Sequence, residues 1–392
     1  MDGIKILGMG HAIPSGRMSN EDMKQFVDTS DEWIRSRTGI ESRSFCLEGE
    51  SQTTLAAGAA REALANAGIS QDQIGLIITA TCTPDYLVPS TSCVVQQALG
   101  LPAGIPAFDI NAACSGFVYG LELVSLMIGK NDPARPYALL IGAEQLSRIL
   151  DFNERGTCVL FGDGAAAAVI APDREKRFYS HLAGDGDLAT LVTRTPHPTG
   201  FPEVLSQEPG ALVKARRADA GDVAEPEAND AGAGDAAEPK SSGAGAGTEP
   251  EANDAVASAA DLRYAGIPET AMNSLRSDHL YMNGKNVFRF AVSVLDQEIS
   301  RMEKESGVAA ADVDYIVCHQ ANARIIEHVR RKRKLPEEMF FMNLQKYGNT
   351  SGASVPLALY DMMSQGLLTE GKRIFVVGFG AGLTWASAYL EF

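Results

Sequence analysis

The stretch FGDGAAAAVIA at residues 161–171 has a counterpart in FGAGLTWASAYL at residues 379–390. Each begins with a glycine-containing turn and continues with the pattern of a strand. Each also follows an apolar strand, YALLIGAE at residues 137–144 in one case and RIFVVGFG at residues 373–380 in the other. We therefore expect two halves built on the same plan.

The two halves also share a helix that leads to a buried strand. Residues 53–67 have the composition of a strong helix, and the apolar strand IGLIITATCT follows at residues 74–83. In the second half, we expect a helix at residues 292–306 and then the strand YIVCHQAN at residues 315–322. Helices that alternate with buried strands indicate an α/β fold.

The second glycine turn superficially resembles a nucleotide-binding loop, because Gly378, Gly380 and Gly382 form the pattern G-x-G-x-G. Such a loop must open a helix, but the residues that follow, LTWASAYLEF, alternate like a strand. The chain also contains no G-K-[ST] sequence. We therefore reject a phosphate-binding role for these glycines.

Residues 218–261 form an acidic, low-complexity segment that repeats the heptad EPEANDA. The segment holds eleven acidic residues and one lysine, so it contributes −10 of the chain's net charge of −16. It lacks aromatic residues, leucine and isoleucine. We predict a disordered insert, more typical of a tolerated surface insertion than of a partner-binding segment.

Composition excludes several classes of protein. The acidic net charge argues against nucleic-acid binding. No apolar run approaches the length of a membrane span, and the first residues, MDGIKILGMG, lack the pattern of a secretory signal. None of the six cysteines forms a C-x-x-C pair, so we expect no zinc knuckle or redox pair. These features predict a cytoplasmic protein.

Three residues carry candidate chemistry. Cys114 falls where the strand-to-helix stretch AFDINAACSGF turns, and the start of a helix favours the nucleophilic thiolate. His319 follows the strand YIVC, whose alternation places Cys318 in the core. Asn349 lies in the turn-rich YGNTSGAS. Taken singly, each is more often a structural residue than a catalytic one.

Taken together, these residues and their surroundings resemble beta-ketoacyl-[acyl-carrier-protein] synthase III, a family of the thiolase-like superfamily. The matching stretches are DTSDEWIRSRTGI, AFDINAACSGF, ERGTCVLFGDGA, HQANARI, YGNTSGAS and GFGAGLTWASAYLEF. The resemblance covers nearly the whole chain outside the insert. It implies a thiolase-like fold of two similar α/β halves, residues 1–172 and 173–392, each with a mixed sheet, stacked in α-β-α-β-α layers.

The resemblance also implies an activity. Cys114, His319 and Asn349 would form the catalytic triad of a condensing enzyme that begins fatty-acid synthesis. Cys114 would take an acyl group from acyl-CoA, with the oxyanion held by the backbone N–H groups of Cys114 and Ala381. His319 and Asn349 would then stabilise the enolate formed from malonyl-acyl-carrier protein. Coenzyme A enters as part of a substrate, and no metal or other cofactor is implied.

Other family positions also have counterparts. The coenzyme A site would include Trp33, Arg37, Arg155 and Gly284. Residues 324–334 carry a local charge of +5, and the resemblance indicates docking of the acidic acyl-carrier protein at Arg289, Arg324, Arg331 and Lys332. The alternative explanation for these basic residues is structural: they would lie at a solvent-exposed helix end, where positive charges are favourable.

The resemblance further implies a homodimer in which the loop TPDYLVP lines the partner's acyl pocket. Val88 stands in this loop where a relative has phenylalanine, which predicts room for branched or slightly longer primers. Alternative functions are a specialised acyltransferase, a condensing enzyme of secondary metabolism, a plant-type polyketide synthase, or a non-catalytic partner subunit. The complete Cys114–His319–Asn349 set argues most strongly against the last of these.

Overall fold

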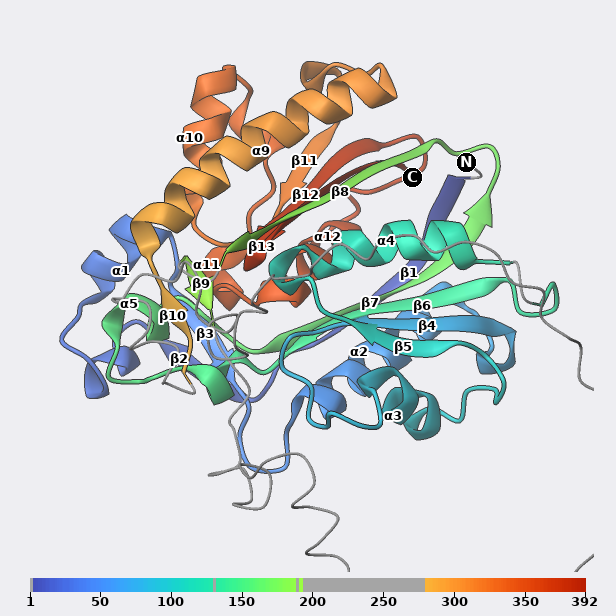
Figure 1. Cartoon of the computed structure of the whole chain (residues 1–392), viewed down its shortest axis with the longest axis horizontal. Coiled ribbons are helices and arrows are strands. Elements are labelled where there is room, and N and C mark those ends of the chain that lie inside the picture. The colour runs from blue at the N-terminus through green and yellow to red at the C-terminus, as the bar shows by residue number, and fades with distance from the viewer. Residues whose placement is uncertain (1–2, 130–131, 188–189, 193–278) are drawn as a thin grey trace, which may run out of the picture. The chain divides into compact units, whose positions relative to one another are not determined.

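The computed structural model describes residues 3–129, 132–187, 190–192 and 279–392. The predicted acidic insert at residues 218–261 lies outside these residues. Two mixed β-sheets hold most of the described strands, and helices cover and separate them (Figure 1).

The first sheet has five strands in the order β1-β7-β6-β4-β5. Strand β4 pairs in parallel with β5 and β6, whereas β7 is antiparallel to both β6 and β1. The bounds of these strands are β1 Gly3–Ala12, β4 Ile74–Ala80, β5 Ala107–Ile110, β6 Tyr137–Glu144 and β7 Gly164–Asp173.

The second sheet repeats this pattern with four strands in the order β11-β12-β13-β8. Strand β11 pairs in parallel with β12, whereas the pairs β12–β13 and β13–β8 are antiparallel. The first sheet has the same succession of pairs, with β4–β6 parallel and β6–β7 and β7–β1 antiparallel. The bounds are β8 Phe178–Asp187, β11 Tyr315–Cys318, β12 Arg373–Gly380 and β13 Gly382–Glu391. Strands β6 and β7 therefore correspond to β12 and β13, which confirms the two halves expected from the sequence.

The helices form three layers around the sheets (Figure 1). Helices α2 (Gln52–Ala67) and α3 (Thr91–Ala98) pack on the outer face of the first sheet. Helices α4 (Gly116–Met127) and α12 (Ser354–Ser364) contact both sheets, and α9 (Gly284–Ser306) packs on β12 and β13. Helix α10 (Ala323–Arg333) packs against α9. This order confirms the α-β-α-β-α layers.

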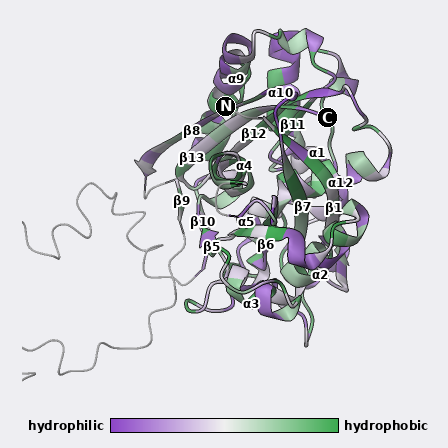
Figure 2. Cartoon of the chain, turned by 90° about the vertical axis from the view of Figure 1, so that its right-hand side faces the viewer, coloured by the Kyte–Doolittle hydropathy of each residue, from purple (hydrophilic) through white to green (hydrophobic). Residues whose placement is uncertain are grey.

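The middle of this stack is apolar, whereas the outer helices are more polar. Figure 2 shows the strands and α4 mainly in the hydrophobic colours, with hydrophilic residues concentrated on α9 and α10. The apolar core contains Phe117 of α4 and Leu359 of α12, both fully buried between the sheets. Burial of large side chains at about 25 cal/mol per Å² of apolar surface is the main force that holds the layers together.

Close backbone packing explains the small residues of the first half. Helix α2 begins with a capping box between Ser51 and Thr54 and ends at Gly68, whose φ is 65°. A Cβ atom at Gly10 would lie 2.3 Å from the backbone of α2. Glycine therefore allows β1 to approach the helix where any side chain would clash.

Smaller elements complete the described chain. They are α1 Asp31–Thr38, α5 Arg155–Cys158 and α11 Leu344–Tyr347, with the strand pairs β2 Gly16–Ser19 and β3 Ser42–Phe45, and β9 Leu191–Val192 and β10 Tyr281–Met282. No helix in the described ranges is long and apolar enough to cross a membrane. All six cysteines are free thiols.

The structure lengthens one predicted helix. Helix α9 begins at Gly284 rather than at residue 292, because the side chain of Asn283 accepts a hydrogen bond from the backbone N–H of Asn286. The predicted boundary between residues 172 and 173 stays a prediction, although β8, which follows it, pairs within the second sheet.

Candidate active site

Cys114 lies at a sharp turn between β5 and α4. It sits in a single 3₁₀ turn, Ala113–Ser115, and only 5% of its surface is exposed. The preceding residue, Ala113, has a φ of 45°, which is a left-handed backbone conformation that residues other than glycine rarely adopt. Strained residues of this kind concentrate at functional sites, so the turn is consistent with the prediction for Cys114.

The end of β12 approaches this cysteine at van der Waals distance. A Cβ atom on Gly380 would lie 2.8 Å from the backbone nitrogen of Cys114 and 3.1 Å from its Sγ atom. Only glycine fits there, and Ala381 follows directly in the chain. The two backbone segments predicted to form the oxyanion hole therefore meet beside the thiol.

The expectation of a Cys114 thiolate is wrong for the free protein. Burial raises the pKa of the Cys114 thiol to about 12. Cys114 lies in the single 3₁₀ turn that precedes α4. The desolvation of its thiol raises the pKa more than the electrostatic effect of the helix start lowers it. The thiol is consequently protonated near neutral pH, and its proton must leave before or during any attack on a thioester.

His319 follows β11 and is almost fully buried. Its Nδ1 atom lies 2.6 Å from Oγ of Ser354, which also accepts a weaker bond from the backbone N–H of Gln320 at 3.4 Å. Because that backbone group can only donate, the serine hydroxyl hydrogen is free to donate to Nδ1, an arrangement that fits the tautomer with the proton on Nε2. Burial lowers the pKa of His319 to about 3, so the ring is neutral near pH 7.

Asn349 is held by the loop that follows it. Its Oδ1 atom accepts a 2.9 Å hydrogen bond from the backbone N–H of Ser351, whose φ is 46°. The backbone of Asn349 bonds to Leu160 and Gly162 of the first half. With Oδ1 occupied, the amide presents its Nδ2 group as a donor.

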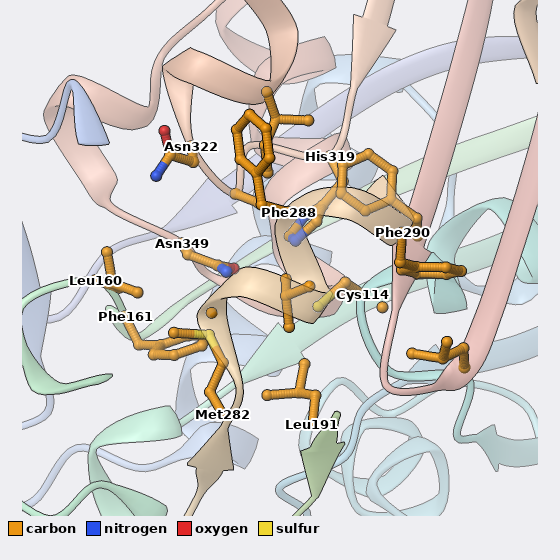
Figure 3. A pocket seen from close by; sticks show the side chains of 17 residues that line it. Cys114, Leu160, Phe161, Leu191, Met282, Phe288, Phe290, His319, Asn322 and Asn349 are labelled. Carbon is orange, nitrogen blue, oxygen red and sulfur yellow. The ribbon is translucent and has the colours of Figure 1, made fainter. Parts of the chain in front are cut away.

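These three residues line one cavity of about 120 Å³. Figure 3 shows the polar ends of Cys114, His319 and Asn349 turned toward the same space. The remaining lining is mainly apolar and comprises Leu160, Phe161, Leu191, Met282, Gly284, Val287, Phe288, Phe290, Ala321, Asn322, Ile325, Phe379, Gly380 and Leu383. The structure therefore brings a thiol and two polar side chains together around one mainly apolar cavity.

Sequence reasoning missed four polar residues around the thiol. The hydroxyl of Ser351 lies 3.4 Å from Cys114 Sγ, and Ser354 orients His319. Cys82 and the fully buried Glu144 lie beyond Ser351. The available signal for Glu144 was its position as the single charged residue at the end of the otherwise apolar strand YALLIGAE.

The predicted coenzyme A residues gather in a second cluster. The guanidinium carbons of Arg37 and Arg155 lie 4.6 Å and 4.5 Å from the ring centroid of Trp33. Arg155 also donates to the backbone oxygen of Asp28 at 2.9 Å. Gly284 lies at the start of α9, in the wall of the cavity.

The predicted docking residues differ in their pairing. Arg331 is bonded to Glu327, and Lys332 lies 2.7 Å from Asp296 of α9. Arg289 and Arg324 are exposed and make no ion pair within the described residues. Of the four predicted docking residues, Arg331 and Lys332 are therefore paired, whereas Arg289 and Arg324 are not paired within the described residues.

Val88 does not line the cavity of its own chain. It stands at the tip of a loop, 87% exposed, next to Leu87, which is 82% exposed. The base of this loop is fixed by Arg148, which bonds to Asp85 and to the backbone oxygens of Thr83 and Pro84. The loop therefore presents an apolar tip on an anchored base.

Comparisons with known proteins match one family. The family 3-oxoacyl-[acyl-carrier-protein] synthase III matches residues 108–186, which include Cys114, and its C-terminal part matches residues 304–392, which include His319 and Asn349. Two similar relatives are the beta-ketoacyl-[acyl-carrier-protein] synthases III of Clostridium tetani and Clostridium acetobutylicum. They are 36% and 37% identical to this chain, over 99% and 100% of it and 98% and 99% of their own lengths.

Solved structures give the same result. The 3-oxoacyl-[acyl-carrier-protein] synthase III of Aquifex aeolicus matches with a TM-score of 0.75 and 31% identity over 100% of both chains. The corresponding enzyme of Thermus thermophilus matches with a TM-score of 0.75 and 33% identity, over 99% of this chain and 98% of its own.

Proposed function

The chain belongs to the beta-ketoacyl-[acyl-carrier-protein] synthase III family, and we propose roles for its residues from the geometry around Cys114. It is an acyltransferase that begins fatty-acid synthesis by joining an acyl-CoA primer to malonyl-acyl-carrier protein with loss of carbon dioxide. The observation that carries the proposed roles is the convergence of Cys114, His319 and Asn349 on one apolar cavity.

In the first half-reaction, the sulfur of Cys114 attacks the thioester carbonyl of acyl-CoA. The negative charge that develops on the carbonyl oxygen is held by the backbone N–H groups of Cys114 and Ala381. The approach of Gly380 to Cys114 supports this role, because it brings the two backbone segments together. Backbone donors in a water-poor site stabilise such an oxyanion without having to reorganise.

In the second half-reaction, His319 and Asn349 donate hydrogen bonds to the thioester carbonyl of malonyl-acyl-carrier protein. Loss of carbon dioxide leaves an enolate, which the same two donors stabilise, and the enolate carbon attacks the acyl group on Cys114. His319 stays neutral because burial holds its pKa near 3, so it acts as a hydrogen-bond donor. Two such donors contribute about 3 kcal/mol each to the transition state.

We further propose that Trp33, Arg37 and Arg155 bind the adenosine end of coenzyme A. The aromatic ring can stack on the adenine base of coenzyme A, and the two exposed guanidinium groups beside it can bind the phosphates. Gly284 lines the cavity and leaves open space where a side chain would stand, which supports a role along the path to Cys114. The acidic acyl-carrier protein docks at Arg289, Arg324, Arg331 and Lys332.

The proposed working form is a cytoplasmic homodimer. The apolar loop tip at Leu87 and Val88 supports the dimer, since adjacent exposed apolar side chains on an anchored loop are typical of an interface. A catalytic thiol and five further free cysteines suit a reducing compartment. Analytical ultracentrifugation of the purified chain measures the oligomeric state directly.

The decisive experiment measures both half-reactions on purified protein. A panel of acyl-CoAs is offered, the intact mass of the Cys114 adduct is recorded, and malonyl-acyl-carrier protein is then added. We expect an adduct that condenses to the 3-ketoacyl product, and no adduct in Cys114→Ala. An adduct that forms without condensing would instead assign the chain to the specialised acyltransferases or the condensing enzymes of secondary metabolism.

A further inference from the structure

Glu144 is a buried carboxyl group for which the two half-reactions above have no use. It ends β6 and is fully buried. Its oxygens accept hydrogen bonds from the hydroxyl of Thr83 at 2.6 Å and from the backbone N–H groups of Cys82 at 3.1 Å and Gly352 at 3.4 Å. Backbone N–H groups can only donate, so the site is built for a carboxylate that accepts.

A continuous line of polar side chains joins this carboxyl to the reactive thiol. The Sγ atom of Cys82 lies 3.4 Å from Glu144, and Ser351 Oγ lies 3.9 Å from Cys82 Sγ. The same Ser351 oxygen lies 3.4 Å from Cys114 Sγ. Every link is within hydrogen-bonding range for sulfur, and each intermediate group can both donate and accept a proton.

We propose that Glu144 is the final proton acceptor of a buried relay through Cys82 and Ser351 that takes the thiol proton of Cys114 during acylation. Ser351 contacts the reacting sulfur and is the catalytic member of the relay. Glu144 acts through the other two residues and is a positioning group that sets the protonation of the site. This inference rests on the proposed acylation of Cys114.

The protons balance over the full cycle. During acylation, Cys114 passes its proton to Ser351, Ser351 passes its own to Cys82, and Cys82 passes its own to Glu144. The sulfur of Cys114 forms a bond to the acyl carbon as the bond from that carbon to coenzyme A breaks, and the departing thiolate takes a proton from water. After condensation, Cys114 leaves as a thiolate and the relay returns the proton from Glu144.

The surroundings of Glu144 favour this role over that of a permanent charge. The titratable groups that face it are the thiols of Cys82 and Cys114. The nearby Arg148 is already bonded to Asp85 and to the loop backbone. Burial raises the pKa of Glu144 above its ordinary value, which makes the carboxylate a stronger proton acceptor.

The test is the acylation rate of Cys114, followed by quenched-flow mass spectrometry between pH 5 and pH 9. We expect the wild-type rate to rise with pH through one inflection set by Glu144. Glu144→Gln keeps the size of the side chain but cannot accept the proton, so it should slow acylation at pH 7 by about 100-fold and remove the inflection. Loss of carbon dioxide from malonyl-acyl-carrier protein, which depends on His319 and Asn349, should change far less.

Two substitutions of Cys82 form a matched pair of variants that tests the relay even if Glu144→Gln does not fold. Cys82→Ala breaks the relay and should slow acylation by at least about tenfold, whereas Cys82→Ser restores a hydrogen-bonding group and should stay within about threefold of wild type. Wild-type rates and pH profiles in both Glu144→Gln and Cys82→Ala would overturn the relay. Equal slowing in Cys82→Ala and Cys82→Ser would assign Cys82 a packing role and also overturn it. Wild-type protein that no acyl-CoA acylates would refute the proposed function itself.

Discussion

The Nδ1 atom of His319 lies 2.6 Å from the hydroxyl oxygen of Ser354, the first residue of α12. This contact joins the end of β11 to the helix layer between the two sheets. A serine hydroxyl that donates to Nδ1 favours the tautomer with the proton on Nε2, and that proton can then be donated toward the cavity.

Replacing Ser354 with alanine tests this orientation. Without the hydroxyl, Nδ1 loses its partner and the neutral ring is free to adopt the wrong tautomer or rotate. We expect condensation of the acylated enzyme to slow by about tenfold, equivalent to about 1.4 kcal/mol, with acylation by acyl-CoA nearly unchanged. The matched control is Ser364→Ala, which removes an exposed hydroxyl from the end of the same helix. Equal slowing of both half-reactions would contradict an orienting role.

The buried histidine also makes stability depend on pH. The pKa of His319 is about 3 in the folded chain, against 6.5 for the free side chain. As pH falls below 6.5, the unfolded chain takes up a proton that the folded chain refuses until about pH 3, so stability falls across that window. Between pH 7 and pH 5 the loss from this residue is about 2 kcal/mol.

Urea unfolding of the wild type and of His319→Gln at the two pH values measures this contribution. The difference between the two proteins removes the effect of the other titrating groups, including Glu144, whose raised pKa has the opposite sign. We expect the wild type to lose more stability than the variant on going from pH 7 to pH 5. If the wild type and His319→Gln lost the same free energy of unfolding between pH 7 and pH 5, His319 would be protonated in the folded protein over this range.

The sequence predicted the architecture because internal repetition and local pattern agreed. The two glycine-turn strands at residues 161–171 and 379–390 became β7 and β13, at equivalent places in the two sheets. The proposed triad was identified by resemblance, and the structure places Cys114, His319 and Asn349 around one cavity. These elements were predictable because they depend on short stretches of consecutive residues.

The polar surroundings of the triad were not predictable in the same way. The thiol of Cys114 is protonated because of three-dimensional burial, which the local helix start does not reveal. The contact between Ser351 and Cys114 joins residues 237 positions apart, and the contact between Cys82 and Ser351 joins residues 269 apart. No periodic pattern connects such pairs, so only the packed fold shows them.

Gly380 tests the close approach behind the oxyanion hole. Gly380→Ala places a methyl group 2.8 Å from the backbone nitrogen of Cys114, so either β12 or the turn that holds Cys114 must shift. We expect acylation to fall at least tenfold and the free energy of unfolding to fall by about 1–3 kcal/mol. Gly186→Ala is the control, because a Cβ atom there meets no atom within 4 Å. Unchanged acylation in Gly380→Ala would remove the backbone of this turn from the proposed mechanism.

Arg289 and Arg324 test the docking of the carrier protein. Their charges are not neutralised within the described residues, so Arg289→Glu with Arg324→Glu should weaken binding of malonyl-acyl-carrier protein by about tenfold or more. The effect should shrink at high salt, and acylation by acyl-CoA should be unchanged. Lys304→Glu is the matched control for Arg289→Glu alone, because it reverses one charge about 22 Å further along α9. Equal loss of binding in this control would indicate a general charge effect.

Val88 tests whether the exposed loop sets primer size in a partner subunit. Its side chain is 87% exposed and absent from the cavity of its own chain, so any effect on the primer must act across an interface. We expect turnover with isobutyryl-CoA or butyryl-CoA in the wild type, because valine leaves space that phenylalanine would fill. Val88→Phe should lower kcat/KM for these primers by about 10- to 200-fold while sparing acetyl-CoA. The control Leu87→Phe adds similar bulk to the same loop tip and should discriminate less. A wild type restricted to acetyl-CoA, with Val88→Phe changing nothing, would show that this loop does not bound the acyl pocket.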